Sequence, residues 1–305
     1  MEDLLKKGLS VAECMASYDV YAREVRGLSA ATRETHNRIL RRFCSFKFGD
    51  AAIAWSAVDY TDCLGFLTAE FERLPNRGTQ RVLLTAMRSI LRYLSRAGAI
   101  ADGWAEALPG TPTRRHAHIP RLVSPEQVKA LFAASRGKTL LALRDRALLL
   151  LFLRLGLRSE EVANLMWRDI DWQDGSLKIR SMKTGHERVL PLPDDLGRAL
   201  SKYLRSFTRM PRWVFESSRA TFPPEKRRLH IKAITRYFFR RAGIVGRSAH
   251  SLRHTVATKM VNHGATFKEV ADLLGHRWIA TTLIYAKLDM KSLAQVALPW
   301  PGGAR

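Results

Sequence analysis

The segment LLGHRWIATTLIYAKLD, residues 273–289, joins a glycine-terminated helix end to an apolar stretch that contains a single tyrosine. The apolar residues are typical of a short buried helix, and they are Trp278, Ile279, Leu283, Ile284 and Leu288. Tyr285 lies among them, so it is either one more core aromatic or a hydroxyl that the segment holds in place. The rest of the chain has to distinguish these two interpretations.

The chain upstream of this segment carries clear signals for helices and for one hairpin. Ser124, Pro125 and Gln127 predict a capped helix start, and Thr266 with Glu269 predicts another that ends at Gly275. The remaining elements are expected at 141–156, 158–167 and 251–264 as helices and at 176–181 and 188–192 as strands. Residues 123–305 therefore predict an α+β domain with a small β-sheet.

Residues 1–108 predict a separate, wholly helical domain. Its helices are expected at 10–27, 29–50, 58–74 and 78–98. The last one places Leu83, Met87, Ile90, Leu91 and Leu94 on one face and Arg81, Arg88, Arg92 and Arg96 on another. A basic face beside a packed face suits phosphate contact, although an isolated basic face is usually only solvated. Between the domains, PGTPTRRHAHIPRL (109–122) has no hydrophobic period and predicts a basic linker.

The charge of the chain points to a polyanionic partner. Lys and Arg number 51 against 28 Asp and Glu, a formal net charge of +23. Such an excess favours nucleic acid over mere solvation of the surface. The N-terminus lacks an apolar signal region, and the apolar run at 147–153 stops at Arg154, too short for a membrane span. We therefore expect a cytoplasmic, nucleoid-associated protein of bacterial type.

Metal and disulfide chemistry are disfavoured by the same sequence. Cys14, Cys44 and Cys63 have neither metal-ligand nor disulfide spacing, which indicates reduced buried thiols. His250 and His254 are four residues apart, a spacing that zinc sites use. The glutamate of such motifs is missing, and Arg253 between the two histidines would repel a cation. We expect no metal and no cofactor.

Six polar residues stand where the local pattern does not require them. They are Arg158, Lys183, His250, Arg253, His276 and Tyr285. Each has an ordinary structural explanation when it is taken alone. Their order and spacing in LGLRSEEV, MKTGHERVLPL, HSLRHTVAT and LLGHRWIATTLIYAKL together resemble the tyrosine recombinase, or phage integrase, family. The resemblance covers residues 123–300 closely and the helical N-terminal half more loosely.

This resemblance implies a fold and a partner. The fold would be mainly α with a small β-sheet, in which a helical, SAM-like core-binding domain (1–108) and a catalytic domain (123–305) form a C-shaped clamp around DNA. The partner would be double-stranded DNA with inverted-repeat half-sites, bound by a homotetramer on synapsed DNA, alone or with related recombinases. The tail, residues 293–305, would dock onto a neighbouring protomer or pack in cis.

The resemblance also assigns a role to each residue. Tyr285 would be the nucleophile, with His250 as the acceptor of its proton, because only about 0.1% of a tyrosine with a pKa near 10 is ionised at pH 7. Arg158 and Arg253 would bind the non-bridging phosphate oxygens, and His276 would add a hydrogen bond. Lys183 would protonate the leaving 5′-oxygen.

Several alternatives remain open from the sequence. Glu161 either orients the site or is a solvated carboxylate in a first helical turn. The protein could also be a catalytically idle DNA-binding relative, or a type IB topoisomerase that uses the same phosphotyrosine chemistry. The filled six positions favour a recombinase, and the tail weakly favours one that belongs to a mobile element.

Overall fold

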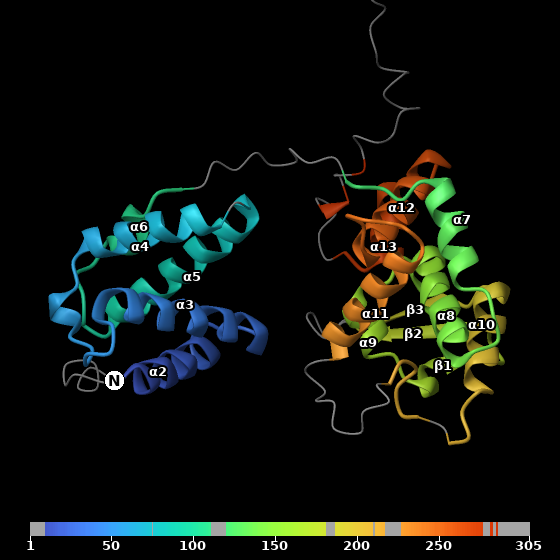
Figure 1. The fold of residues 1–305 in the computed structure, drawn as a ribbon, viewed down its shortest axis with the longest axis horizontal. Coiled ribbons are helices and arrows are strands. Elements are labelled where there is room, and N and C mark those ends of the chain that lie inside the picture. The colour runs from blue at the N-terminus through green and yellow to red at the C-terminus, as the bar shows by residue number, and fades with distance from the viewer. Residues whose placement is uncertain are drawn as a thin grey trace, which may run out of the picture. The chain divides into compact units, whose positions relative to one another are not determined.

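The computed structural model describes residues 10–74, 76–110, 120–180, 187–209, 211–216 and 227–276, together with Thr281, Thr282 and Tyr285. The chain divides into two compact units, Met1–Arg115 and His116–Arg305 (Figure 1). Each unit has its own apolar core. The described residues confirm the expected fold class, because they are mainly helical and contain one small sheet.

The N-terminal unit is built from helices. They are α2 (Val11–Glu24), α3 (Ala30–Phe48), η1 (Trp55–Ala57), α4 (Tyr60–Arg73), α5 (Arg77–Arg96) and α6 (Trp104–Ala107). Of these, α2, α3, α4 and α5 have side-chain caps at their starts. Ser10 with Glu13, and Asp59 with Asp62, form capping boxes that satisfy the free amides at the starts of α2 and α4. The predicted helices are thus confirmed, with ends shifted by a few residues.

Helix α5 supplies much of the core of this unit and confirms the predicted apolar stripe. Its residues Leu83, Met87, Ile90, Leu91 and Leu94 are all buried. Tyr18 is a buried polar group with partners, because its hydroxyl lies 2.6 Å from His36 Nδ1 and donates to Ser89 Oγ at 2.9 Å. A buried polar group without such a partner would cost free energy.

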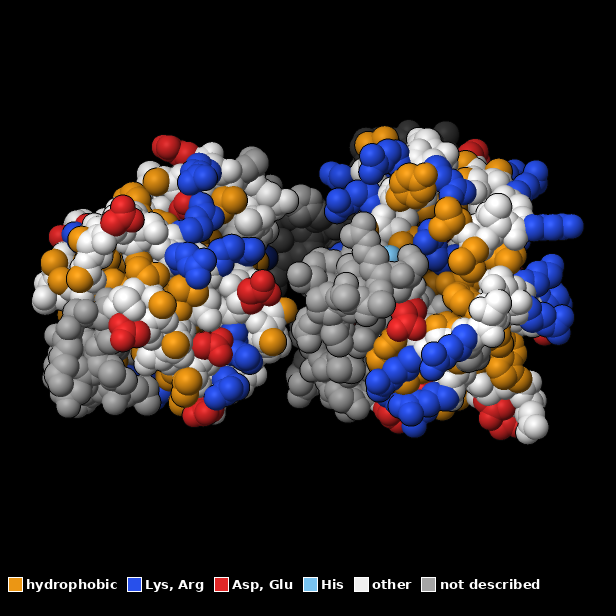
Figure 2. Space-filling view, turned by 60° about the horizontal axis from the view of Figure 1, so that its bottom comes forward, with side chains coloured by type: hydrophobic (Ala, Val, Ile, Leu, Met, Phe, Trp, Pro, Cys, Tyr) orange, Lys and Arg blue, Asp and Glu red, His pale blue; other side chains and the backbone are white. Residues whose placement is uncertain are grey.

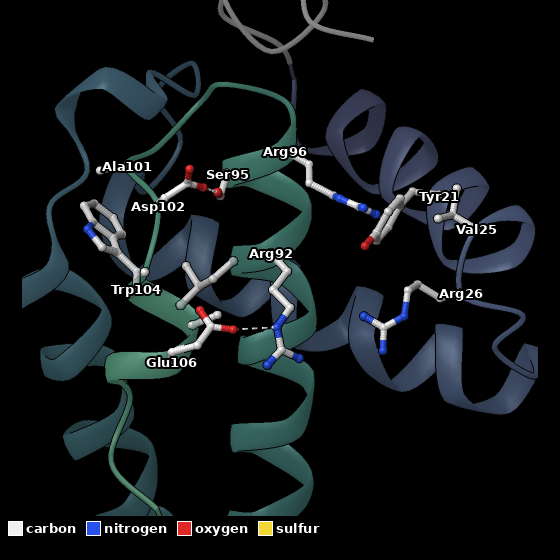
Figure 3. Close-up of a pocket in the computed structure, with 13 residues that line it drawn as sticks. Tyr21, Val25, Arg26, Arg92, Ser95, Arg96, Ala101, Asp102, Trp104 and Glu106 are labelled. Atoms are coloured by element: carbon white, nitrogen blue, oxygen red, sulfur yellow. Dashed lines mark hydrogen bonds and ion pairs between the residues drawn. The ribbon is translucent and has the colours of Figure 1, made fainter.

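The basic face of α5 has a partly structural role. Arg88 donates to the backbone carbonyls of Ala105 (3.2 Å) and Leu108 (2.8 Å) and so ties residues 105–109 to the helix. Arg92 donates to Glu106 at 2.9 Å. Figure 3 shows Arg92 and Arg96 on the wall of a pocket of about 560 Å³. Arg88 therefore has a structural role, and phosphate contact by the basic face stays a prediction.

The C-terminal unit combines helices with a three-stranded antiparallel sheet in the order β1-β2-β3. Its elements are α7 (Pro125–Ala134), α8 (Leu140–Leu155), α9 (Ser159–Ala163), η2 (Trp167–Asp169), β1 (Ile170–Asp171), β2 (Ser176–Arg180), β3 (Glu187–Pro191), α10 (Asp194–Leu204), α11 (Arg227–Arg241), α12 (Ala249–Asn262) and α13 (Phe267–Leu274). The hairpin register pairs Ile179 with Arg188. The predicted helix at 158–167 is shorter than expected, because it ends at Ala163.

Some expectations fall on parts of the chain that lie outside the described residues. These are Lys183, the apolar neighbours of Tyr285 (Trp278, Ile279, Leu283, Ile284 and Leu288), residues 111–119 of the linker and the tail 293–305. None of the described helices has the length and apolar character that a bilayer crossing requires. In the view of Figure 2, Lys and Arg side chains are spread over the visible surface of each unit.

Gly156 brings two helix ends together and so prepares the site. It ends α8 with φ +58°, in the left-handed region that favours glycine. A Cβ at this position would lie 2.7 Å from Leu274 Cδ2 and 3.8 Å from Arg253 Cγ. The absence of a side chain at residue 156 therefore lets the end of α13 pack against the end of α8.

We expect Gly156→Ala to destabilise the protein more than Gly175→Ala. Both glycines have nearly the same φ, +58° and +59°, so both substitutions carry the left-handed penalty of about 1–2 kcal/mol. Of these two positions, residue 156 alone is crowded, and overpacking there adds about 1–3 kcal/mol to the loss of stability. Urea unfolding of the two variants measures the difference, and equal losses would contradict the close approach of Leu274.

Candidate active site

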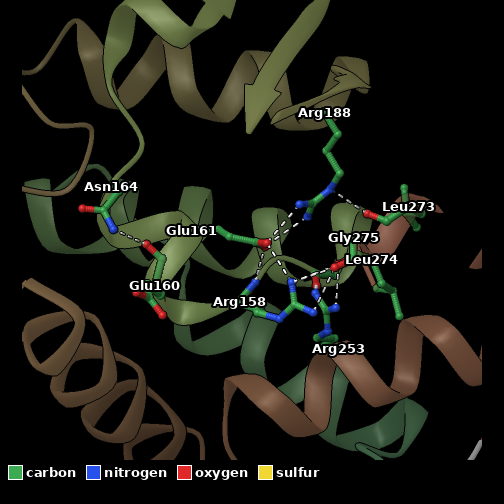
Figure 4. A network of polar contacts seen from close by, with 10 residues as sticks. Arg158, Glu160, Glu161, Asn164, Arg188, Arg253, Leu273, Leu274 and Gly275 are labelled. Carbon is green, nitrogen blue, oxygen red and sulfur yellow. Dashed lines mark hydrogen bonds and ion pairs between the residues drawn. The ribbon is translucent and has the colours of Figure 1, made fainter. Parts of the chain in front are cut away.

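The C-terminal end of α13 is the centre of the site. A helix leaves its last carbonyls without partners, and these carbonyls attract cations. Here the carbonyls of Leu273, Leu274 and Gly275 accept hydrogen bonds from the side chains of Arg188, Arg253 and Arg158 (Figure 4). Arg158 also donates to Leu274 O at 3.3 Å. The end of one helix thus collects three guanidinium groups from three other elements.

Arg158 is held by a network and remains partly open to solvent. It precedes α9, and its Nη1 donates to Glu161 Oε1 at 3.0 Å and to Gly275 O at 3.3 Å. Its backbone amide donates to the other oxygen of Glu161 at 2.8 Å. The side chain is 38% exposed, so donors of this guanidinium can reach a bound anion.

Arg253 is fixed more deeply. It is only 1% exposed, and its Nη1 and Nη2 each donate at 2.6 Å, to Gly156 O and to Leu274 O. Burial and the neighbouring charge of Arg158 lower the pKa of Arg253 to about 9. The guanidinium is still charged at neutral pH, and its two bonds to helix-end carbonyls fix the plane of the group.

Glu161 is a buried acceptor shared by two arginines. It is 4% exposed, and Arg188 donates to both of its oxygens at 3.0 Å while Arg158 donates from the other side. Burial acts to raise the pKa of Glu161, but the hydrogen bonds and charges of Arg188 and Arg158 lower it below the usual value. The alternative of a solvated carboxylate is therefore wrong.

The hydroxyl of Tyr285 lies beside His254. Its Oη is 2.9 Å from His254 Nδ1, and the two rings meet edge to face with centroids 5.6 Å apart. Tyr285 is 1% exposed, and burial raises its pKa although Arg253 and Arg158 act to lower it. The ring of His250, which was expected to contact the hydroxyl, packs against that of His254, with centroids 4.1 Å apart.

His276 completes the described cluster. Its amide donates to Ala271 O and closes the end of α13, while its Nδ1 lies 2.8 Å from Thr282 Oγ1. Burial, followed by the charges of Arg253 and Arg158, lowers the pKa of His276 to about 3. The imidazole is therefore neutral at pH 7 and can act as a neutral hydrogen-bond donor.

The structure thus brings together most of the residues singled out in the sequence. Arg158, Arg253 and His276 meet at the end of α13, and Tyr285 joins His250 through His254. Lys183 lies outside the described residues. Among those described, no group of three or more His, Cys, Asp or Glu side chains could hold a metal ion.

Sequence reasoning missed two members of the site, Arg188 and His254. Arg188 stands in a strand where an arginine usually faces solvent, so nothing local marked it. His254 was weighed only as a metal ligand with His250, yet HSLRH places it one helical turn after His250. That spacing was the available signal for a second imidazole near the tyrosine.

Known proteins resemble this chain over most of its length. The model of the Phage integrase family matches residues 121–292. The chain is 34% identical to a putative integrase/recombinase, y4rA, of Sinorhizobium fredii, over 97% of this chain and 73% of that protein. It is 31% identical to the tyrosine recombinase XerC of Pelobacter propionicus, over 93% of each chain.

A solved structure shows the same fold at low sequence identity. The XerH site-specific recombinase, bound to a palindromic difH substrate in a post-cleavage complex, matches with a TM-score of 0.71 and 17% identity. The match covers 96% of this chain and 85% of that chain. On the strength of the family match and the relatives, the chain belongs to the phage integrase family of tyrosine recombinases, enzymes that cleave and rejoin DNA strands.

Proposed function

We propose that the protein is a site-specific recombinase that cuts and rejoins DNA through a covalent 3′-phosphotyrosine intermediate at Tyr285. The observation that carries this proposal is the end of α13, where Arg158, Arg253 and His276 meet. Two guanidinium groups and a neutral imidazole are suited to a phosphodiester whose negative charge grows in the transition state. The bond that forms and the bond that breaks are both P–O bonds, so the reaction needs neither an oxidant nor ATP.

The proton balance assigns the remaining roles. As Tyr285 Oη bonds to phosphorus, its O–H bond breaks, and an imidazole of the His250–His254 pair accepts the proton. We expected His250 in this role, but His254 is the imidazole in contact with the hydroxyl. As the P–O bond to the 5′-oxygen breaks, Lys183 donates a proton to that oxygen. The phosphotyrosine bond resembles the bond it replaces, so a second 5′-hydroxyl can reverse the step.

The partner we propose is double-stranded DNA with two inverted-repeat half-sites. The net charge of +23 supports a polyanion, and the XerH relative in fold was solved on a palindromic substrate. One protomer on each half-site of two duplexes makes four protomers, which is the homotetramer we propose, alone or with related recombinases. The helical unit 1–108 would bind the core of the site, and both units would form a clamp around the duplex.

The biological setting we propose is the bacterial nucleoid, where the enzyme would act in the integration, excision or transposition of a mobile element. The relative y4rA carries the name integrase/recombinase, which supports this setting.

We expect Tyr285→Phe to abolish covalent attachment to DNA, because phenylalanine keeps the packing of the ring and removes the nucleophile. The measurement uses a nicked suicide substrate carrying a cognate site, on which the wild-type protein is trapped as a denaturation-resistant adduct. Absence of the wild-type adduct on every cognate site would favour an idle DNA-binding relative. Relaxation of site-free plasmid at substoichiometric protein would favour a topoisomerase.

We expect Arg158→Ala to lower the single-turnover cleavage rate by roughly 10²–10³-fold, as loss of one donor to a developing charge does in other enzymes. DNA affinity should fall little, since many other phosphates are contacted. Arg158 is the better test than Arg253, because its side chain is 38% exposed, whereas Arg253 is 1% exposed and its removal would also take away the hydrogen bond to Gly156 O. An affinity loss as large as the rate loss would argue against this role.

We expect stability to fall as pH decreases from about 6.5 towards 4. The pKa of His254 is lowered to about 4 by burial and by His250, and that of His276 to about 3. Below pH 6.5 the unfolded chain therefore binds more protons than the folded one, and acid favours unfolding. Urea unfolding at pH 7.5 and 5 measures this, and His254→Asn should flatten the dependence; an unchanged slope would refute the buried neutral imidazole.

A further inference from the structure

Arg188 uses its donors entirely within the protein. It lies on β3, and its Nη1 and Nη2 donate to the two oxygens of Glu161 at 3.0 Å each. Its Nε donates to Leu273 O at 3.1 Å, and the side chain is 15% exposed. Every nitrogen of this guanidinium therefore has a partner, in a geometry that orients a carboxylate from two points.

The same carboxylate orients Arg158. Glu161 Oε1 accepts from Arg158 Nη1 at 3.0 Å, and Oε2 accepts from the Arg158 amide at 2.8 Å. Figure 4 shows Glu161 between the two guanidinium groups. Because Arg188 approaches both oxygens, rotation of the carboxylate away from Arg158 would break two hydrogen bonds at once.

The backbone leaves room for Arg188. Gly275 has φ +62°, and a Cβ at this position would lie 2.6 Å from Arg188 Nη1 and 3.0 Å from Cζ. The guanidinium thus fills the space beside Gly275, whose carbonyl accepts from Arg158. Arg188 therefore contacts Glu161 and the end of α13, which are the two hydrogen-bonding partners that hold the Arg158 side chain.

We propose that Arg188 is a positioning residue for DNA cleavage, which holds Glu161 and the end of α13 so that the Arg158 guanidinium faces the scissile phosphate. The inference rests on the proposed function, since it assumes that Arg158 binds that phosphate. Arg188 itself does not bind DNA in this account. Its substitution therefore affects cleavage only through Arg158.

A second buried carboxylate provides a matched control. Asp145 is fully buried and shared by two arginines, Arg144 (Nη2–Oδ1 2.8 Å) and Arg241 (Nη1–Oδ2 3.0 Å). Arg144 is 17% exposed, close to the 15% of Arg188. Arg144→Lys and Arg188→Lys therefore each remove a guanidinium from a buried carboxylate that two arginines share, and both residues lie in the same unit. Of these two arginines, Arg188 is the one that contacts α13 and Glu161.

The test is a double-mutant cycle on single-turnover cleavage of suicide DNA. Arg188→Lys should slow cleavage roughly 10–100-fold, by analogy with residues that orient metal ligands, with DNA affinity changed by less than about twofold. In the Arg158→Ala background the same substitution should cost less than about twofold. Arg144→Lys should lower the thermal midpoint as much as Arg188→Lys and leave the cleavage rate within about twofold of wild type.

Two outcomes of the cycle overturn the proposal. An equal loss of rate in both backgrounds would mean that Arg188 acts independently of Arg158. A loss of DNA affinity, with the salt slope reduced by about one, would make Arg188 a phosphate contact instead.

Hydrogen exchange in the DNA-free protein separates this inference from the proposed function. Arg188→Lys should increase exchange at the amides of Gly275 and His276, which bond to Asp272 O and Ala271 O, and Arg144→Lys should not. Unchanged exchange would refute the positioning role whether or not the protein cleaves DNA. Increased exchange together with no wild-type adduct would refute only the proposed function.

Discussion

The structure of the site depends on the attraction between the last carbonyls of α13 and the guanidinium groups of Arg158, Arg188 and Arg253. These carbonyls carry the partial negative charge of a helix C-terminus and have no partners within the helix. Arginines from three other elements satisfy them, so α9, β3 and α12 are joined to α13 at one point. The same helix end leads through His276 towards Tyr285. The two arginines that we propose for phosphate binding are thus held at one junction, and His276 follows it directly in the chain.

This junction contains three guanidinium groups and one carboxylate, so its net charge is positive. Repulsion between the arginines would open it if the carbonyls and Glu161 did not offset it, and this explains why Glu161 is buried rather than solvated. A bound phosphate would add the missing negative charge. The imidazoles of His254 and His276 stay neutral beside these cations, because burial and the neighbouring positive charges lower their pKa values.

Local features of this protein could be predicted from the sequence, while its long-range convergence could not. The capping boxes of Ser124 with Gln127 and of Thr266 with Glu269 depend on residues three apart, so the sequence alone located both helix starts. The family resemblance supplied the set of Arg158, Arg253 and His276. Nothing local could reveal that Arg158 and Arg253, together with Arg188, donate to three consecutive carbonyls. Arg188 could not be found in this way because its partner Glu161 lies 27 residues away, and the spacing of His254 from His250 pointed first to a metal site.

The most direct test of the central claim is the identification of the residue that becomes bonded to DNA. The covalent complex trapped on a suicide substrate would be digested with trypsin and nuclease, and the nucleotide-bearing peptide sequenced by mass spectrometry. We expect one modified peptide, between Arg277 and Lys287, with the 3′-phosphate on Tyr285. A phosphate on any other residue, or a linkage through the 5′ end of the strand, would contradict it.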